Sequence, residues 1–122
     1  MIGIDIIEIP RIAQAIANEN FITKHFSENE IEYFKSKNMS PQSIAGSWAA
    51  KEAFSKALGT GVRGFSLLDI EVLRNEQGMP FIVCKGRKLY SSVSISHSKE
   101  NAVAAVVLPW YSRIQIKLLF KI

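Results

Sequence analysis

The first stretch of the chain has the apolar pattern of a buried strand. Residues 2–9, IGIDIIEI, are rich in β-branched side chains and almost continuously apolar, with Asp5 and Glu8 as charged interruptions. Pro10 ends this strand, and apolar residues recur at helical spacing within 11–20. We therefore expect a strand that is followed directly by a helix.

A second helix is predicted to begin beside Ser27. Glu30 stands three residues later, which is the spacing of a capping box, and Phe26 and Ile31 occupy the two positions of a hydrophobic staple. A polar loop over 35–43 follows, because this segment contains a proline and few apolar residues.

A long central helix is predicted from 44 to 58. Apolar residues recur three and four positions apart through this range, and Gly59 provides the glycine that commonly follows a helix C-terminus.

The second half of the chain has the pattern of strands. Two pairs of apolar segments are each joined by a short polar turn, and they cover 67–73, 80–84, 92–96 and 102–108. The tail 109–122 alternates apolar and mostly polar residues, which predicts an extra strand. The pattern as a whole predicts an α+β fold, with an antiparallel sheet, a long central helix and shorter helices.

Composition indicates one ordinary domain over residues 1–122. The chain is 48% hydrophobic and 21% charged, and its net charge of +4 suits an anionic partner or a phosphate-bearing substrate. Cys84 is the only cysteine, so an intrachain disulfide is impossible. The apolar start is too short to span a membrane and contains two acids. We expect a cytoplasmic protein with no membrane partner.

Asp5 is the first candidate for chemistry. It stands where the strand pattern calls for an apolar residue, and an unpaired buried carboxylate costs several kcal/mol. Either a cation or hydrogen bonds compensate the charge, or the strand ends early and Asp5 is half-exposed.

Glu52 and Lys56 are the second candidates. Their i, i+4 spacing places them on one helix face, where they form either an ordinary exposed ion pair or part of a polar stripe with Lys51 and Ser55. The stripe leads into the turn Gly59–Gly61, whose backbone can approach an anion closely. The phosphate-loop pattern GxxxxGK[ST] is absent from the sequence.

His97 is predicted in a hairpin, flanked by Ser96 and Ser98, where imidazole and hydroxyl groups can bond a ligand. A hydrolase or another metal-dependent nucleotide enzyme is an alternative, although a serine hydrolase would have the residue types it needs without the G-x-S-x-G elbow. A basic binding module without catalysis is a further alternative. No nucleic-acid-binding signature accompanies the positive charge, so we expect no nucleic acid partner.

Taken in order, several motifs resemble the holo-acyl-carrier-protein synthase family of 4′-phosphopantetheinyl transferases. The resemblance covers residues 2 to about 108 and is carried by GIDIIEIPRI, FSENEIEYF, WAAKEAFSKALGTG, GMP and SISHS. It implies transfer of 4′-phosphopantetheine from coenzyme A to a serine of apo acyl carrier protein, in fatty acid biosynthesis, with release of adenosine 3′,5′-bisphosphate.

The resemblance also implies a site. Asp5 and Glu52 match the family's Mg²⁺ ligands. Together with Lys56, they are the residues that the resemblance implies to be catalytic. Arg11 matches an arginine that docks the carrier protein. The positions that correspond to coenzyme A contacts are Lys56, Gly59, Thr60, Gly61, Pro80, Ser96 and His97.

Assembly is a further implication, since larger relatives join two copies of this unit in one chain. The short form is expected to be a homo-oligomer, most simply a trimer, with coenzyme A between subunits. Three features depart from the family: Ser47 replaces a frequent arginine, the segment 84–92 is too short for the usual helix, and the tail 109–122 is additional.

Overall fold

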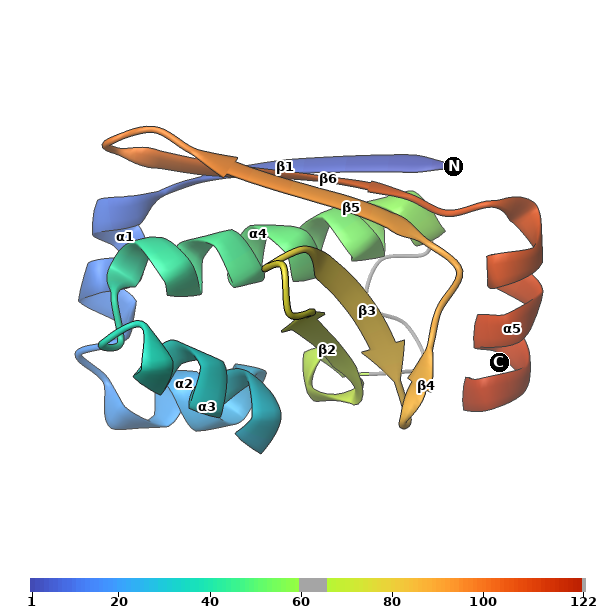
Figure 1. Cartoon of the computed structure of the whole chain (residues 1–122), viewed down its shortest axis with the longest axis horizontal. Helices are drawn as coiled ribbons and strands as arrows, with labels where there is room; N and C mark the ends of the chain where they lie inside the picture. Colours follow the sequence, from blue (N-terminus) through green and yellow to red (C-terminus); the bar gives the residue numbers. More distant parts are fainter. Residues whose placement is uncertain (60–65, 122) are drawn as a thin grey trace.

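The computed structural model describes residues 1–59 and 66–121, and it confirms the α+β fold. The central helix α4 packs beneath one antiparallel sheet, while a second, smaller sheet and the short helices lie on its other side (Figure 1). The first sheet has the strand order β1-β6-β5 and the second β2-β3-β4.

The elements follow the predicted order with several changes of boundary. The helices are α1 (Ile9–Ala15), α2 (Glu19–His25), α3 (Glu28–Ser36), α4 (Pro41–Leu58) and α5 (Trp110–Phe120), with a short 3₁₀ helix η1 (Leu67–Asp69). The strands are β1 (Ile2–Glu8), β2 (Ile70–Arg74), β3 (Pro80–Cys84), β4 (Arg87–Lys88), β5 (Ser92–His97) and β6 (Asn101–Val107). Within the described ranges, no helix is long and apolar enough to cross a membrane.

Helix α4 ends at the expected glycine but begins at Pro41, three residues before the predicted start at 44 and inside the predicted loop. Ser40 is the N-cap and its side chain accepts from the backbone N–H of Ser43, while Gly59 ends the helix at φ 80°. Strand β1 approaches α4 very closely at Gly3, where an added Cβ would lie 1.8 Å from the carbonyl oxygen of Ala53. This contact requires a glycine and holds β1 against the helix that carries Glu52.

The capping box of α3 is confirmed, because Ser27 Oγ accepts from the Glu30 N–H and Glu30 Oε1 accepts from the Ser27 N–H. Helix α2 has no counterpart among the predicted elements. The single helix expected over 11–20 ends at Ala15, and Asn18 caps a new helix by accepting from the Asn20 N–H. Asn18 and Glu19, which the prediction places at the end of the first helix, therefore form the start of α2.

The strand predicted for 109–122 is wrong, since the structure has helix α5 there. Alternate apolar positions in so short a segment also fit a helix, and packing decides between the two. Ile116 is fully buried, and the half-buried Leu119 and Phe120 pack against the same core cluster. An isolated edge strand would not bring these three side chains to one core.

Candidate active site

Asp5 lies in the middle of β1, directly opposite Ala104 of β6. Its side chain is half-buried, and Lys56 Nζ of α4 donates to Asp5 Oδ1 at 2.9 Å and to the carbonyl oxygen of Ile4 at 3.2 Å. Lys56 is therefore the cation that compensates the carboxylate in the described chain. The lysine side chain is 57% exposed, so the pair contributes little to stability and remains accessible to a ligand.

Glu52 stands one turn before Lys56, and its pKa is raised from the ordinary glutamate value. Burial is the main cause and the negative charge of Asp5 adds to it, whereas the charges of Lys56 and His25 oppose the rise. Two carboxylates and one ammonium group thus share a small region between β1 and α4. His25 also lies near this region, and the sequence analysis did not select it.

The polar stripe expected around Glu52 does not include all four predicted residues. Lys51 is completely buried on another face of α4, where Nζ donates to Glu30 Oε1 at 2.7 Å and to the carbonyl oxygens of His25 and Leu67 at 2.7 and 2.8 Å. Ser55 is also buried and donates to the carbonyl oxygen of Lys51. Lys51 therefore anchors the helix and is unavailable to an exposed ligand.

The residues at this site fit Mg²⁺ better than a metal that needs an all-protein cage. Among the residues the structure describes, no group of three or more His, Cys, Asp or Glu side chains could hold a metal ion. Mg²⁺ is commonly held by one or two carboxylates, with waters and substrate phosphates completing its shell. The repulsion between Asp5 and Glu52 is the kind that a divalent cation relieves.

The C-terminus of α4 leads away from this cluster. Gly59 is exposed in the left-handed conformation, and Arg113 of α5 donates to the carbonyl oxygen of Leu58 at 3.3 Å. Thr60 and Gly61, the other residues predicted in this turn, lie outside the described residues.

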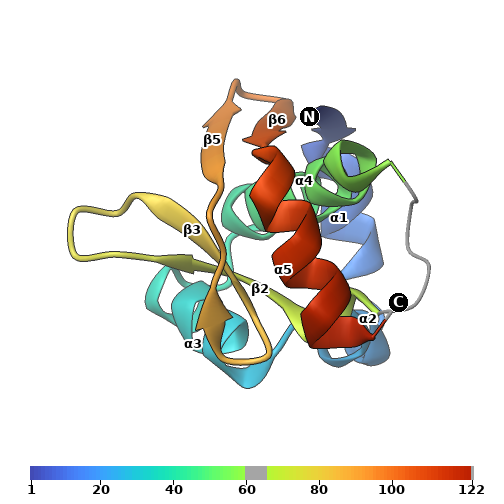
Figure 2. The same ribbon diagram turned by 90° about the vertical axis from the view of Figure 1, so that its right-hand side faces the viewer.

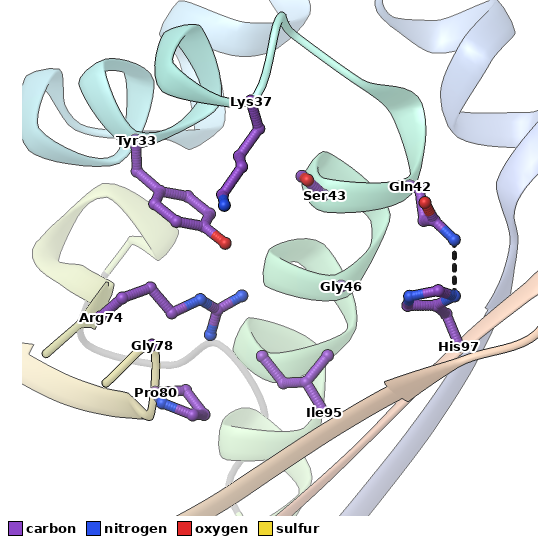
Figure 3. A pocket seen from close by; sticks show the side chains of 10 residues that line it. All are labelled: Tyr33, Lys37, Gln42, Ser43, Gly46, Arg74, Gly78, Pro80, Ile95 and His97. Atoms are coloured by element: carbon purple, nitrogen blue, oxygen red, sulfur yellow. Dashed lines mark hydrogen bonds between the residues drawn. The ribbon is translucent and has the colours of Figure 1, made fainter. Parts of the chain in front are cut away.

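A separate pocket of about 320 Å³ contains Pro80 and His97, two of the residues predicted to contact coenzyme A (Figure 3). Side chains and backbone from α3, α4, β5 and the β2–β3 hairpin converge on it. The lining residues are Tyr33, Lys37, Gln42, Ser43, Gly46, Arg74, Gly78, Pro80, Ile95 and His97.

The pocket is electropositive, a property that the sequence analysis did not detect. The Arg74 guanidinium lies over the Tyr33 ring at 5.0 Å, and Lys37 Nζ lies 5.9 Å from the same ring centre. Arg74 Nη1 is buried and has no hydrogen-bond partner among the described residues. The Gln42 amide nitrogen lies 2.5 Å from His97 Nδ1, which also lies 3.3 Å from the carbonyl oxygen of Ser98, so these contacts orient the imidazole at the edge of the pocket. An anion would satisfy these groups.

Two other predicted positions, Ser96 and Arg11, lie apart from the pocket. Ser96 precedes His97 on the same strand, so the two side chains point to opposite faces of the sheet, and Ser96 is exposed on the outer face. Arg11 is exposed on α1. Ser47, which replaces the family's frequent arginine, is buried, and its hydroxyl has no partner in the part of the chain that is described.

The acidic cluster and the electropositive pocket lie on opposite sides of α4. Ser43 lines the pocket and Glu52 belongs to the cluster, and nine residues of an α-helix make about two and a half turns. In the first sheet, Asp5 of β1 and Ile95 of β5 both pair with Ala104 of the intervening strand β6, so their backbones are about 10 Å apart. Within one chain the two groups therefore face different directions.

The part of the first sheet's outer face that β1 and β6 form is apolar and exposed in the single chain. Ile2, Ile4 and Ile6 of β1 are 67%, 58% and 66% exposed, and each lies opposite a β6 residue on the same face. Those neighbours are Val107, Ala105 and Val103. A contiguous patch of this kind usually marks an interface.

Comparison with known proteins gives consistent matches over the body of the chain. Residues 1–107 match the family model described as the 4′-phosphopantetheinyl transferase superfamily. The chain is 52% identical to a Clostridium perfringens protein named holo-[acyl-carrier-protein] synthase, over 121 residues covering 88% of this chain and 91% of the relative. It is 54% identical to the Clostridium beijerinckii protein of the same name, over 88% of this chain and 94% of the relative.

Solved structures with the same fold include two described with a bound ligand. A Helicobacter pylori holo-[acyl-carrier-protein] synthase in complex with coenzyme A is 36% identical, with a TM-score of 0.78, and the match covers 89% of this chain and 100% of that chain. A Bacillus anthracis holo-(acyl-carrier-protein) synthase in complex with coenzyme A (3′,5′-ADP) is 44% identical, with a TM-score of 0.77, over 88% and 93% of the two chains.

Proposed function

Because the chain belongs to the 4′-phosphopantetheinyl transferase superfamily, we propose that it transfers 4′-phosphopantetheine from coenzyme A to a serine of apo acyl carrier protein. The reaction releases adenosine 3′,5′-bisphosphate and equips the carrier protein for fatty acid synthesis. The observation that carries the proposal is the cluster of Asp5, Glu52 and Lys56, which lies within the region matched by the family.

Asp5 and Glu52 would hold Mg²⁺ beside the coenzyme A diphosphate. The bound ion would supply positive charge to the diphosphate oxygens, where negative charge develops during transfer. Lys56 adds a point charge at the same place, since its ammonium group is exposed and already bonded to Asp5. The raised pKa of Glu52 also suits a group that accepts the proton of the attacking serine, either directly or through water.

The electropositive pocket would bind the adenosine end of coenzyme A. Lys37, Arg74 and His97 offer donors for the 3′-phosphate, and the buried nitrogen of Arg74 without a partner among the described residues supports an anion site here most directly. Pro80 and Ile95 provide apolar surface for the adenine ring. This division assigns the diphosphate to the acidic cluster and the nucleoside to the pocket.

A homotrimer with shared sites accounts for the separation of these two groups. One chain presents them on opposite sides of α4, so a single coenzyme A would join the acidic cluster of one subunit to the His97 pocket of its neighbour. The apolar outer face formed by β1 and β6 supports the association, because an assembly would bury it.

Arg11 would contribute to docking of the acidic carrier protein. It is exposed on α1, which follows the strand that carries Asp5, and an exposed arginine there can steer a negatively charged partner. Its reversal to glutamate should raise the Michaelis constant for the carrier protein and leave that for coenzyme A nearly unchanged. Equal effects on both substrates would contradict a docking role.

The transfer reaction has a direct test. Apo acyl carrier protein is incubated with coenzyme A, Mg²⁺ and the protein, and mass spectrometry measures addition of phosphopantetheine. We expect addition by the natural chain and a loss of about 100-fold or more in Asp5→Asn and Glu52→Gln, because each removes one negative ligand. Glu8→Gln is the matched control, since Glu8 is exposed at the end of the same strand. Full activity in either site variant would refute the assignment.

A mixing experiment tests the shared site separately. Inactive Glu52→Gln chains and impaired His97→Ala chains are refolded together, and native mass spectrometry confirms that hybrids form. Hybrids should regain activity, because some sites then combine natural residues from two chains. Confirmed hybrids without any recovery would rule out sharing while leaving the transferase activity itself untouched.

A further inference from the structure

Positive charge is concentrated in the last third of the chain. Residues 78–122 contain seven Lys and Arg residues and a single acid, Glu100, whereas residues 1–77 contain eight Lys and Arg against ten Asp and Glu. The net charge of +4 therefore arises entirely from the C-terminal part. Two of its cations lie in α5 and a third is its C-cap, and three more, Lys85, Arg87 and Lys88, lie in and beside β4, next to α5 (Figure 1).

Helix α5 also carries an uncovered apolar stripe. Trp110, Ile114 and Leu118 follow one another at i, i+4 and i+8, and they are 73%, 52% and 74% exposed. Figure 2 shows α5 in front of the other elements, with its outward side turned away from the molecule. Arg113, Lys117 and Lys121 follow one another with the same sequence spacing, and all three are exposed. Arg113 also donates to the carbonyl oxygen of Leu58, and Lys121 is the C-cap that follows the helix. We call these six residues the outer face of α5.

The outer face is held in place by the opposite side of the helix. Ile116 is fully buried in the core, Ser112 Oγ donates to the carbonyl oxygen of Tyr90, and Lys85 Nζ donates to the carbonyl oxygen of Leu119 at 3.2 Å. The stripe is therefore already formed and cannot turn inward without breaking these contacts. A ligand that binds it has no folding cost to overcome.

Aromatic rings extend the apolar surface beyond the helix. The Trp110 and Tyr111 ring centres are 5.6 Å apart, and those of Tyr111 and Tyr90 are 5.5 Å apart. Tyr90 is 65% exposed and Tyr111 45%. Tryptophan and tyrosine are enriched where a protein meets the headgroup region of a bilayer, because the ring is apolar and its N–H or O–H remains hydrated.

We propose that the outer face of α5 rests on the surface of a membrane that contains anionic phospholipids. The helix has the composition of an interfacial helix, in which an apolar stripe with tryptophan enters the headgroup boundary while adjacent cations bind lipid phosphates. No membrane-spanning segment is needed. The proposal revises the expectation of no membrane partner, which considered only whether the apolar start of the chain could span a bilayer.

A second copy of the chain is a poorer occupant for this face. In a symmetric contact, each residue meets its own counterpart region, so the rows of Arg113, Lys117 and Lys121 would approach one another with no acid in residues 101–122 to compensate. An anionic surface instead neutralises all three cations together and accommodates the apolar stripe beside them.

The test measures co-sedimentation of the full chain with lipid vesicles. Vesicles of equal parts phosphatidylcholine and phosphatidylglycerol are compared with vesicles of phosphatidylcholine alone, and native mass spectrometry of each variant records its assembly. We expect partition into the anionic vesicles only, weakening as salt rises from 50 to 300 mM because the surface attraction is screened. Equal partition into both kinds of vesicle, or into neither, would overturn the proposal.

Variants of the outer face identify the surface that binds. Lys117→Glu and Leu118→Ser should each reduce partition about tenfold, because one reverses a charge and the other removes apolar contact. Leu118→Met keeps the apolar contact and should bind normally, and so should Lys35→Glu, which changes an exposed lysine on α3. If Lys35→Glu weakens binding as much as Lys117→Glu, net charge explains the result and the assignment to α5 is wrong. Loss of natural assembly in Leu118→Ser would assign the stripe to a subunit contact instead.

Discussion

Replacing Lys51 with methionine should be among the most damaging single changes in α4. Lys51 Nζ is completely buried and donates to Glu30 Oε1 and to two backbone carbonyl oxygens. Methionine has a similar shape and preserves the packing, so the change isolates the loss of the ammonium group. It leaves the Glu30 carboxylate buried without its cation.

The expected magnitude follows from that imbalance. Removing one partner of a buried ion pair usually costs about 3–5 kcal/mol, because the other charge remains desolvated. Glu30 retains hydrogen bonds from the backbone N–H groups of Ser27 and Val72, both at 3.0 Å, which should keep the loss near the lower limit. The double variant Glu30→Gln/Lys51→Met removes both charges and should recover part of the loss.

The loss should also depend on pH. Burial raises the pKa of Glu30 in the folded chain, and the charge of Lys51 opposes this rise, so removing Lys51 raises the pKa further. A carboxyl with a raised folded pKa contributes stability at low pH and loses it as pH rises through that pKa. The free energy of unfolding of Lys51→Met should therefore be closer to that of the natural chain at pH 5 than at pH 8.

Urea unfolding followed by circular dichroism measures the loss of stability and its pH dependence. One protein concentration is used throughout, because assembly affects apparent stability. The natural chain, the single variant and the double variant are compared at pH 5 and pH 8. A loss below about 1 kcal/mol at pH 8 would contradict a buried ion pair. The same loss at both pH values would contradict the role given to Glu30.

Further changes test the packing around the site. Gly3→Ala should prevent stable folding or separate β1 from α4, since its Cβ would lie 1.8 Å from the Ala53 carbonyl oxygen; Gly46→Ala, with its Cβ 3.0 Å from Ile95 Cγ2, should cost far less in thermal denaturation. Deleting residues 109–122 should leave the chain aggregated or molten, measured by light scattering and near-ultraviolet circular dichroism, because it removes the buried Ile116 from the core. Burial raises the pKa of the Cys84 thiol to about 12, so Cys84 should resist Ellman's reagent at pH 8 until the chain is unfolded.

Local patterns in the sequence were sufficient for most of the fold. The capping box of Ser27 and Glu30 defines the start of α3, and the glycine after Leu58 defines the end of α4, because both signals act within a few residues. The same is true of the spacing that puts Glu52 and Lys56 on adjacent turns. These features need no knowledge of distant parts of the chain.

Contacts between distant segments decided what remained. Lys51 and Glu52 are adjacent charged residues, and nothing in the sequence indicates that only one of them is buried. Lys51 is an internal anchor because Glu30, 21 residues away in sequence, packs beside α4, whereas Glu52 faces Asp5. Arg74 and Lys37 meet only after β2 and α3 are brought together around Tyr33, so no spacing predicts their pocket.

The tail shows the same limit most clearly. The apolar residues of the tail fit either a strand or a helix. Which of the two forms depends on the core that the tail packs against, beside the short segment 85–90. Helix α5 fills that surface with Ile116 and bonds the carbonyl oxygens of Lys88 and Tyr90. The sequence by itself therefore determined where apolar residues recur at helix or strand spacing. Where one segment fits both spacings, tertiary packing decided between helix and strand, because only the burial of apolar side chains separates the two in free energy.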